Sequence, residues 1–242
     1  MIRFINDYLL IFAILLSAIL SIPKLGFGQE NIDLRSELLT ITNSTYGADD
    51  KLINGKYYRP KHFYAEGHPY FLTKDWQIAE LHIKGASFKE IRLKYNIEDD
   101  VLIIRKIFNN RVSKNISLNN SFVDSLEIGT HTFHNTNNLN LKNTIGIAEL
   151  ICKGKIHAYI KHHIEYIEGQ STHNKSDYAE AKTMLYLLDN NSFISISSKN
   201  DLLANFSGHQ KKIKQYMRKN KIRLKKAQTK QLMNLIHFCE QL

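Results

Sequence analysis

Apolar and polar residues alternate with a period of two from Trp76 onward. Over Trp76–Lys84 one face collects Ala79, Leu81 and Ile83, and the opposite face collects Glu80, His82 and Lys84. The same alternation then places Ile91, Leu93 and Tyr95 opposite Glu90, Arg92 and Lys94. Strict alternation predicts strands with one face in contact with water, and Gly85-Ala86 between the two runs indicates a type II′ turn. We therefore expect a β-hairpin.

More strands follow this hairpin. Asn96–Asp99 predicts a turn and Asp100–Phe108 a third strand, which completes an antiparallel meander. Further runs with strand character are Val112–Leu118, Ser121–Ile128, Thr130–His134, Ile145–Cys152, Lys155–Tyr166, Ala179–Leu188 and Ser192–Ser197. Many short antiparallel strands joined by polar turns predict a mainly β (α+β) fold over residues 29–198, arranged as a curved sheet, a sandwich or a partial barrel.

Residues 199–242 have a helical pattern instead. Asn200 or Asp201 is a suitable N-cap for a short helix over Leu202–Phe206. Gln210–Asn220 and Thr229–Gln241 carry apolar residues at helical spacing, while Lys221–Lys226 alternates briefly. We expect these basic C-terminal helices to pack on the β domain.

The first 28 residues predict export. An uncharged run of 15 residues, Tyr8–Ile22, follows a short polar start and precedes the small residues Gly26 and Gly28. The run is shorter than the ~20 residues that span a bilayer, and small residues suit signal peptidase. We expect a signal peptide cleaved after Gly28; an uncleaved N-terminal anchor is the alternative.

Two stretches carry a resemblance to other proteins. One is the meander, with Trp76, Gly85, Leu93-x-Tyr95-Asn96 and Asp99-Asp100; the other is the basic ending KKIKQYMRKNKIRLKK. Together with the Gly28-Gln29 end of the signal peptide, they resemble a group of uncharacterised exported proteins of the Bacteroidota. The resemblance implies a β-rich protein of the periplasm or outer membrane and supplies no catalytic residue.

Charge is concentrated near the C-terminus. The chain has a formal net charge of +10, and ten of its 33 Lys and Arg lie between Lys211 and Lys230, with no acidic residue among them. The candidate contacts to an anionic surface are Lys211, Lys212, Lys214, Arg218, Lys219, Lys221, Arg223, Lys225 and Lys226. Their partner is an anionic lipid or polysaccharide surface, another envelope protein, or only solvent; export argues against nucleic acid.

Metal and acid–base chemistry have weak sequence signals. His131 and His134 point to opposite faces if they lie on a strand, and His157 and His163 are too far apart along one strand to chelate one ion. Glu98-Asp99-Asp100 suits either a simple turn or calcium. We expect no cofactor and no metal.

Recognisable nucleophile motifs are missing from the sequence, with no Gly-x-Ser-x-Gly elbow, phosphate loop or dinucleotide fingerprint. Cys152, in an apolar run, is expected to be unreactive; it pairs with Cys239 in a disulfide or both remain separate buried thiols. The sequence therefore favours a non-catalytic exported envelope protein with a binding or structural role. The alternative is an envelope hydrolase whose site forms only in three dimensions.

Overall fold

The computed structural model describes residues 52–107, 112–169 and 175–242, all within one compact unit, Gly47–Leu242. The predicted signal peptide, Met1–Gly28, lies outside the described residues.

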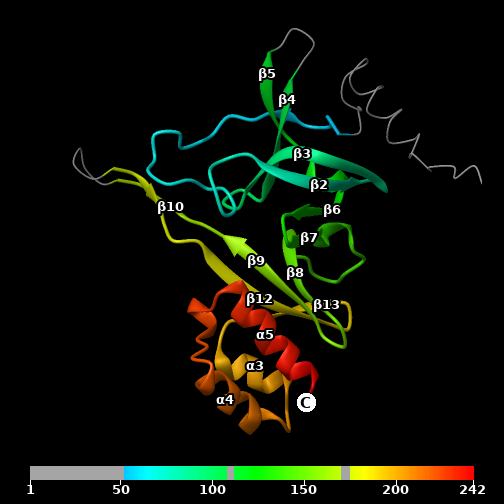
Figure 1. Cartoon of the computed structure of the whole chain (residues 1–242), viewed down its shortest axis with the longest axis vertical. Helices are drawn as coiled ribbons and strands as arrows, with labels where there is room; N and C mark the ends of the chain where they lie inside the picture. Colours follow the sequence, from blue (N-terminus) through cyan, green and yellow to red (C-terminus); the bar gives the residue numbers. More distant parts are fainter. Residues whose placement is uncertain (1–51, 108–111, 170–174) are drawn as a thin grey trace, which may run out of the picture. The chain divides into compact units, whose positions relative to one another are not determined.

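A curved antiparallel sheet dominates this unit (Figure 1). Within the described residues it has eleven strands in the order β1-β5-β4-β3-β2-β6-β7-β8-β9-β12-β13. Their bounds are β1 Lys56–Tyr57, β2 Gln77–Ile83, β3 Ala86–Asn96, β4 Val101–Ile107, β5 Ser113–Ser117, β6 Val123–Ile128, β7 His131–Asn135, β8 Ile147–Lys153, β9 His157–His163, β12 Lys182–Asp189 and β13 Ser192–Ile196. Most neighbours in the sheet are also neighbours in sequence; the exception near its middle is the pairing of β2 with β6. The prediction of a mainly β fold built from an antiparallel meander is confirmed.

The first hairpin forms as predicted, but with a different turn. Strand β2 ends at Ile83 and β3 begins at Ala86, so the two turn residues are Lys84 and Gly85. Both have positive φ (48° and 74°), the requirement of a type I′ turn. The predicted type II′ turn at Gly85-Ala86 is therefore wrong by one residue.

A bulge in β3 changes the predicted register. The pairing with β2 shifts between Ala79 and Leu81, and Glu90 has a φ of +56°. Leu81, Ile83 and Leu93 are fully buried as expected, whereas Ile91 is only half-buried. Lys94, expected to be exposed, is half-buried because its ammonium lies over the rings of Tyr70 and Trp76.

Four short elements differ from the predicted pattern. The predicted run Lys155–Tyr166 breaks after His163, and the chain forms a separate two-stranded ribbon from β10 (Tyr166–Ile167) and β11 (Asp177–Tyr178). The start of Ser121–Ile128 belongs to a 3-10 turn, η1 (Asn120–Phe122), and another, η2 (Thr136–Asn138), follows β7.

The helices cover the end of the sheet formed by β8, β9, β12 and β13 (Figure 1). They are α3 (Lys199–Asn205), α4 (Gln210–Lys219) and α5 (Thr229–Glu240), with the 3-10 turn η3 (Leu224–Lys226) between the last two. Ser198 caps α3 and forms a capping box with Asp201, so neither Asn200 nor Asp201 is the N-cap. The predicted packing of C-terminal helices on the sheet is confirmed.

Two large apolar clusters hold the fold together. The first cluster is formed mainly by strands β2 to β8 and includes Leu81, Leu93, Leu126 and Phe133. The second cluster lies between the helices and the strands β8, β9, β12 and β13, and includes Ile160, Leu185, Ile213 and Leu235. Strand β8 contributes to both clusters, through Ile147 to the first and Ile151 to the second.

Candidate functional site

The main candidate site is a groove on the helical segment. Helix α4 is amphipathic: Ile213 and Met217 are buried in the second cluster, and the lysines beside them point outward. After the helix, buried Ile222 and Leu224 alternate with exposed Lys221, Arg223 and Lys225. Burial of the apolar positions therefore forces the cations onto the surface.

The groove has a volume of about 1000 Å³. Its lining is formed by Lys199, Lys211, Lys214, Gln215, Met217, Arg218, Lys221, Ile222 and Arg223. Six of these nine residues are cationic and none is acidic, so the lining has a strongly positive potential. We call this feature the basic groove.

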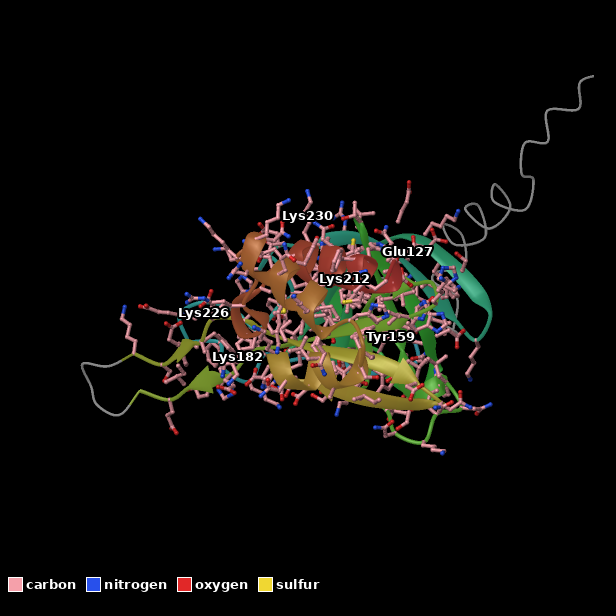
Figure 2. All side chains as sticks on the ribbon, turned by 90° about the horizontal axis from the view of Figure 1, so that it is seen from below. Glu127, Tyr159, Lys182, Lys212, Lys226 and Lys230 are labelled. Atoms are coloured by element: carbon pink, nitrogen blue, oxygen red, sulfur yellow. The ribbon has the colours of Figure 1, made fainter. Side chains whose placement is uncertain are left out.

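The sequence-predicted contact residues divide into two sets. Lys211, Lys214, Arg218, Lys221 and Arg223 line the basic groove, whereas Lys212, Lys219, Lys225 and Lys226 are exposed outside its lining. In Figure 2, Lys212, Lys226 and Lys230 are labelled on the helical segment. Sequence reasoning missed Lys199, since it precedes the basic run and reaches the groove only through the position of α3.

The cations of the basic run have no acidic partners among the described residues. Every ion pair that the described part of the chain forms involves other cations, such as Lys61, Lys161 and Lys182. The positive charge of residues Lys211–Lys230 is therefore not neutralised by ion pairs with described residues.

A second candidate site combines a buried carboxylate with two imidazoles. Glu149 on β8 is 3% exposed; its Oε1 lies 2.6 Å from His131 Nδ1, and its Oε2 lies 2.6 Å from His162 Nε2. Burial raises the pKa of Glu149, but the bonds from His162 and His131 outweigh it and leave the pKa below its ordinary value. The carboxylate is therefore ionised and orients both rings.

These two rings face a small pocket. With a volume of about 230 Å³, it is lined by His68, Tyr70, Phe71, Leu72, Ile97, His131, His162, Ile164, Ala181 and Thr229. We call it the histidine pocket. The Phe71 ring contacts both His131 and His162 edge-on, at centroid distances of 5.1 and 4.8 Å. The sequence does not connect His162 with Glu149, because the two residues lie on different strands.

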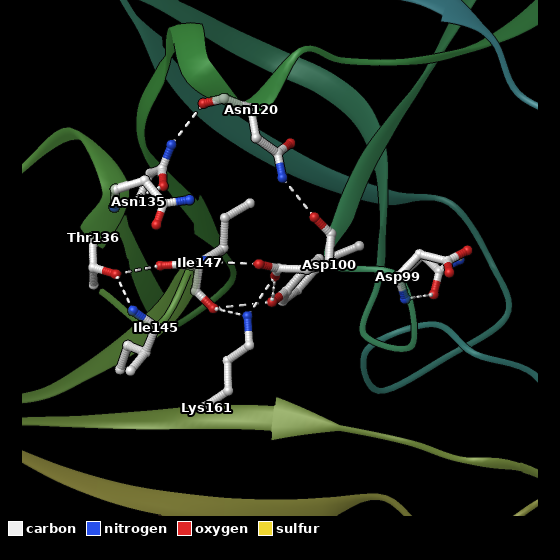
Figure 3. A network of polar contacts seen from close by, with 12 residues as sticks. Asp99, Asp100, Asn120, Asn135, Thr136, Ile145, Ile147 and Lys161 are labelled. Atoms are coloured by element: carbon white, nitrogen blue, oxygen red, sulfur yellow. Dashed lines mark hydrogen bonds and ion pairs between the residues drawn. The ribbon is translucent and has the colours of Figure 1, made fainter. Parts of the chain in front are cut away.

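A network of polar contacts joins β3, the turn between β3 and β4, β8 and β9 (Figure 3). Asp100 Oδ1 lies 2.6 Å from Lys161 Nζ and accepts a hydrogen bond from the buried Tyr95 hydroxyl at 2.6 Å. Asp100 Oδ2 accepts from the backbone N–H of Ile147. Burial lowers the pKa of Lys161, and Asp100 opposes this shift. All of these partners are internal, so the network is structural.

The acidic turn Glu98-Asp99-Asp100 does not form a calcium cradle. Asp99 pairs with Lys61, Asp100 with Lys161, and Glu98 accepts a hydrogen bond from Tyr178. The three carboxylates are directed to different partners.

The four histidines named as candidate metal ligands in the sequence analysis do not form a shared site. His131 approaches Glu149, whereas His134, on the opposite face, lies 3.4 Å from the Tyr159 hydroxyl; this confirms that the two point in opposite directions. Burial lowers the pKa of His134. His157 is exposed at the start of β9 and His163 is half-buried at its end.

Both cysteines are free and buried, so the disulfide alternative is wrong. Burial raises the pKa of the Cys152 thiol to about 11 and that of Cys239 to about 12, in agreement with the expectation that Cys152 is a poor nucleophile.

Comparison of the chain with protein-family models, with curated proteins and with solved structures finds no match. Among the described residues, no helix has the length and apolar character needed to cross a membrane.

Proposed function

We propose that the protein is a non-catalytic, exported envelope protein that binds an acidic polysaccharide in the basic groove. The observation that supports this most directly is the lining itself, in which six cations and no carboxylate surround a concave volume. A cleft lined by charges of one sign concentrates ligands of the opposite sign.

The shape of the site favours a linear polyanion over a lipid surface. A chain of sugars with carboxylate or sulfate groups can enter a groove and meet several of its cations at once, whereas a flat bilayer meets mainly the outward cations. Gln215 also lines the groove and can exchange hydrogen bonds with sugar hydroxyls.

Export is proposed from the sequence. The apolar run Tyr8–Ile22 and the small residues at Gly26 and Gly28 favour a cleaved signal peptide. The resemblance to exported Bacteroidota proteins favours the periplasm or the outer membrane. Mass spectrometry of the protein from its native host should then find an N-terminus at Gln29, and a chain that retains Met1 in the membrane fraction would favour the anchor instead.

The groove can be tested with two variants of equal charge. The groove variant replaces Lys211, Lys214, Arg218, Lys221 and Arg223 by Gln; the control replaces Lys212, Lys219, Lys225, Lys226 and Lys230 by Gln. Each variant loses five exposed positive charges from the same segment. Because exposed charges contribute little to stability, both variants should remain folded. The groove variant should lose at least about tenfold in affinity for immobilised heparin and polygalacturonate, and the control much less.

The wild-type affinity should also fall as salt rises, because the attraction is screened. Equal losses in the two variants would show that total charge rather than the groove determines binding. Stronger binding to anionic vesicles than to either polysaccharide would contradict the proposed partner.

The histidine pocket supports an envelope hydrolase as a second candidate function. A buried carboxylate that orients two imidazoles beside a pocket is an arrangement suited to general-base activation of water. The test is a panel of ester, peptide and glycoside substrates with wild-type protein and His131→Ala. Turnover that His131→Ala abolishes would support the hydrolase, and turnover unaffected by the change would exclude this pocket as its site.

A further inference from the structure

A third cluster of side chains lies where α5 meets β8, away from both sites above. Cys152 is the second-last residue of β8, and His237 and Glu240 lie three residues apart on α5. Residues with this spacing share one face of a helix. One ligand atom from each side chain lies within 4.8 Å of the other two. We propose that Cys152, His237 and Glu240 bind a divalent cation of the zinc class, a role independent of the proposed polysaccharide binding.

Two of the three distances between the ligand atoms are close to those of a zinc site, and the third is at most 4.8 Å. Cys152 Sγ lies 3.9 Å from His237 Nδ1, and His237 Nδ1 lies 3.2 Å from Glu240 Oε2. Zinc bond lengths at tetrahedral angles place sulfur and nitrogen ligands about 3.6 Å apart, and nitrogen and oxygen ligands about 3.4 Å apart. Small side-chain movements would therefore complete the geometry.

The carboxylate of Glu240 is already oriented. Its Oε1 accepts a hydrogen bond of 3.0 Å from the backbone N–H of Ile156, which leaves Oε2 on the side of His237. This N–H bond, more than any other contact, keeps the pKa of Glu240 below its ordinary value, so the group is anionic. The carboxylate also lies against Gly154, where a Cβ would collide with it. Backbone support of this kind is typical of metal ligands.

The geometry distinguishes a metal site from a catalytic relay. In a cysteine–histidine–acid relay, the thiol and the acid contact different nitrogens of the imidazole. Here Sγ and Oε2 both approach Nδ1 of His237, as ligands around one ion do.

The mixture of ligands points to the class of ion. One thiolate, one imidazole and one carboxylate suit zinc, whereas magnesium and calcium prefer oxygen ligands alone. The His237 side chain is 53% exposed, which gives the ion a route from solvent and leaves room for a water molecule as fourth ligand.

Cobalt(II) titration of the full-length chain tests the thiolate ligand. Wild-type protein and Cys239→Ala should develop a near-ultraviolet thiolate-to-cobalt absorption band that added Zn²⁺ removes, and Cys152→Ala should lose the band. The comparison is matched, since both cysteines are buried free thiols. Absence of the band in wild-type protein, or its persistence in Cys152→Ala, would overturn the proposal.

The zinc affinity of a His237 variant tests the exposed ligand, since this substitution does not change the core. His237→Ala should weaken Zn²⁺ binding by at least about 100-fold. Mutation of a group that only orients a metal ligand typically weakens binding by about 10- to 100-fold, and loss of the ligand itself should cost no less. His157→Ala, another exposed histidine, should leave it unchanged. Equal affinities of the two variants would mean that zinc binds elsewhere.

Discussion

The two apolar clusters differ in where their polar neighbours lie. The first cluster, around Leu93, lies next to polar and charged groups that are themselves buried. The second cluster, around Leu235, is covered by helices whose cations are exposed to solvent. All the described polar residues that are buried belong to the sheet and the turns near the first cluster: Asn96, Ser117, Asn135, Thr136, Glu149 and His162. Polar groups next to the first cluster therefore join neighbouring strands, as Glu149 on β8 does with His131 on β7 and His162 on β9. Charges over the second cluster have no such role and are free to meet a ligand.

The largest effects should come from the part that the two regions have in common, their apolar packing. Leu93→Ala and Leu235→Ala each remove a fully buried leucine, and each should lower the free energy of unfolding by about 2–5 kcal/mol. Arg92→Ala, which truncates an exposed neighbour, should cost little. Urea denaturation measures all three. A midpoint for Leu93→Ala as high as that for Arg92→Ala would show that the assigned faces of β3 are wrong.

The next effect should separate enclosed charges from exposed ones. Asp100→Asn leaves the Lys161 ammonium without its anionic partner in a site where the lysine side chain is only 14% exposed, so we expect a loss of about 3 kcal/mol. Glu165→Gln breaks the exposed pair with Lys182 and should cost well under about 1 kcal/mol.

A double variant shows whether this cost belongs to the pair. Replacement of Lys161 by Met in the Asp100→Asn background removes the unpaired charge and should restore part of the stability. Additive losses in the double-mutant cycle would mean that the two residues act separately.

A smaller difference between buried and exposed carboxylates should appear in the stability of the protein at acidic pH. The pKa of Glu149 is below its ordinary value of 4.5, so the carboxylate stabilises the fold fully above that pH, and the stabilisation disappears as the pH falls through the lowered value. Glu149→Gln should therefore flatten the decline of the urea midpoint below pH 4.5, and the exposed Glu127→Gln should not. The same decline in both variants would assign the acid sensitivity to other carboxylates.

The sequence predicted most strands and helices well, because their periodicity depends only on residues that are close together in the chain. Alternation identified β2 through Ala79, Leu81 and Ile83, and helical spacing identified α4 through Ile213 and Met217. The ribbon of β10 and β11 was missed because two residues per strand are too few to show a period.

The candidate sites divide in the same way. Five of the six cations of the basic groove could be predicted because they lie close together in sequence. Glu149 with His131 and His162, and Cys152 with His237 and Glu240, could not be, because their members meet only through strand order and helix packing. No spacing in the sequence encodes either contact.

The concentration of positive charge on one segment has a consequence for the rate of association. Outside Lys211–Lys230, the chain's remaining basic residues are matched in number by its acidic ones. At a distance, the protein therefore presents a positive centre displaced to the helical segment, and a negatively charged polymer exerts a torque on it as well as an attraction. Encounters should be oriented before contact, with the helices turned toward the polymer, so that a larger share of collisions lead to binding at low ionic strength.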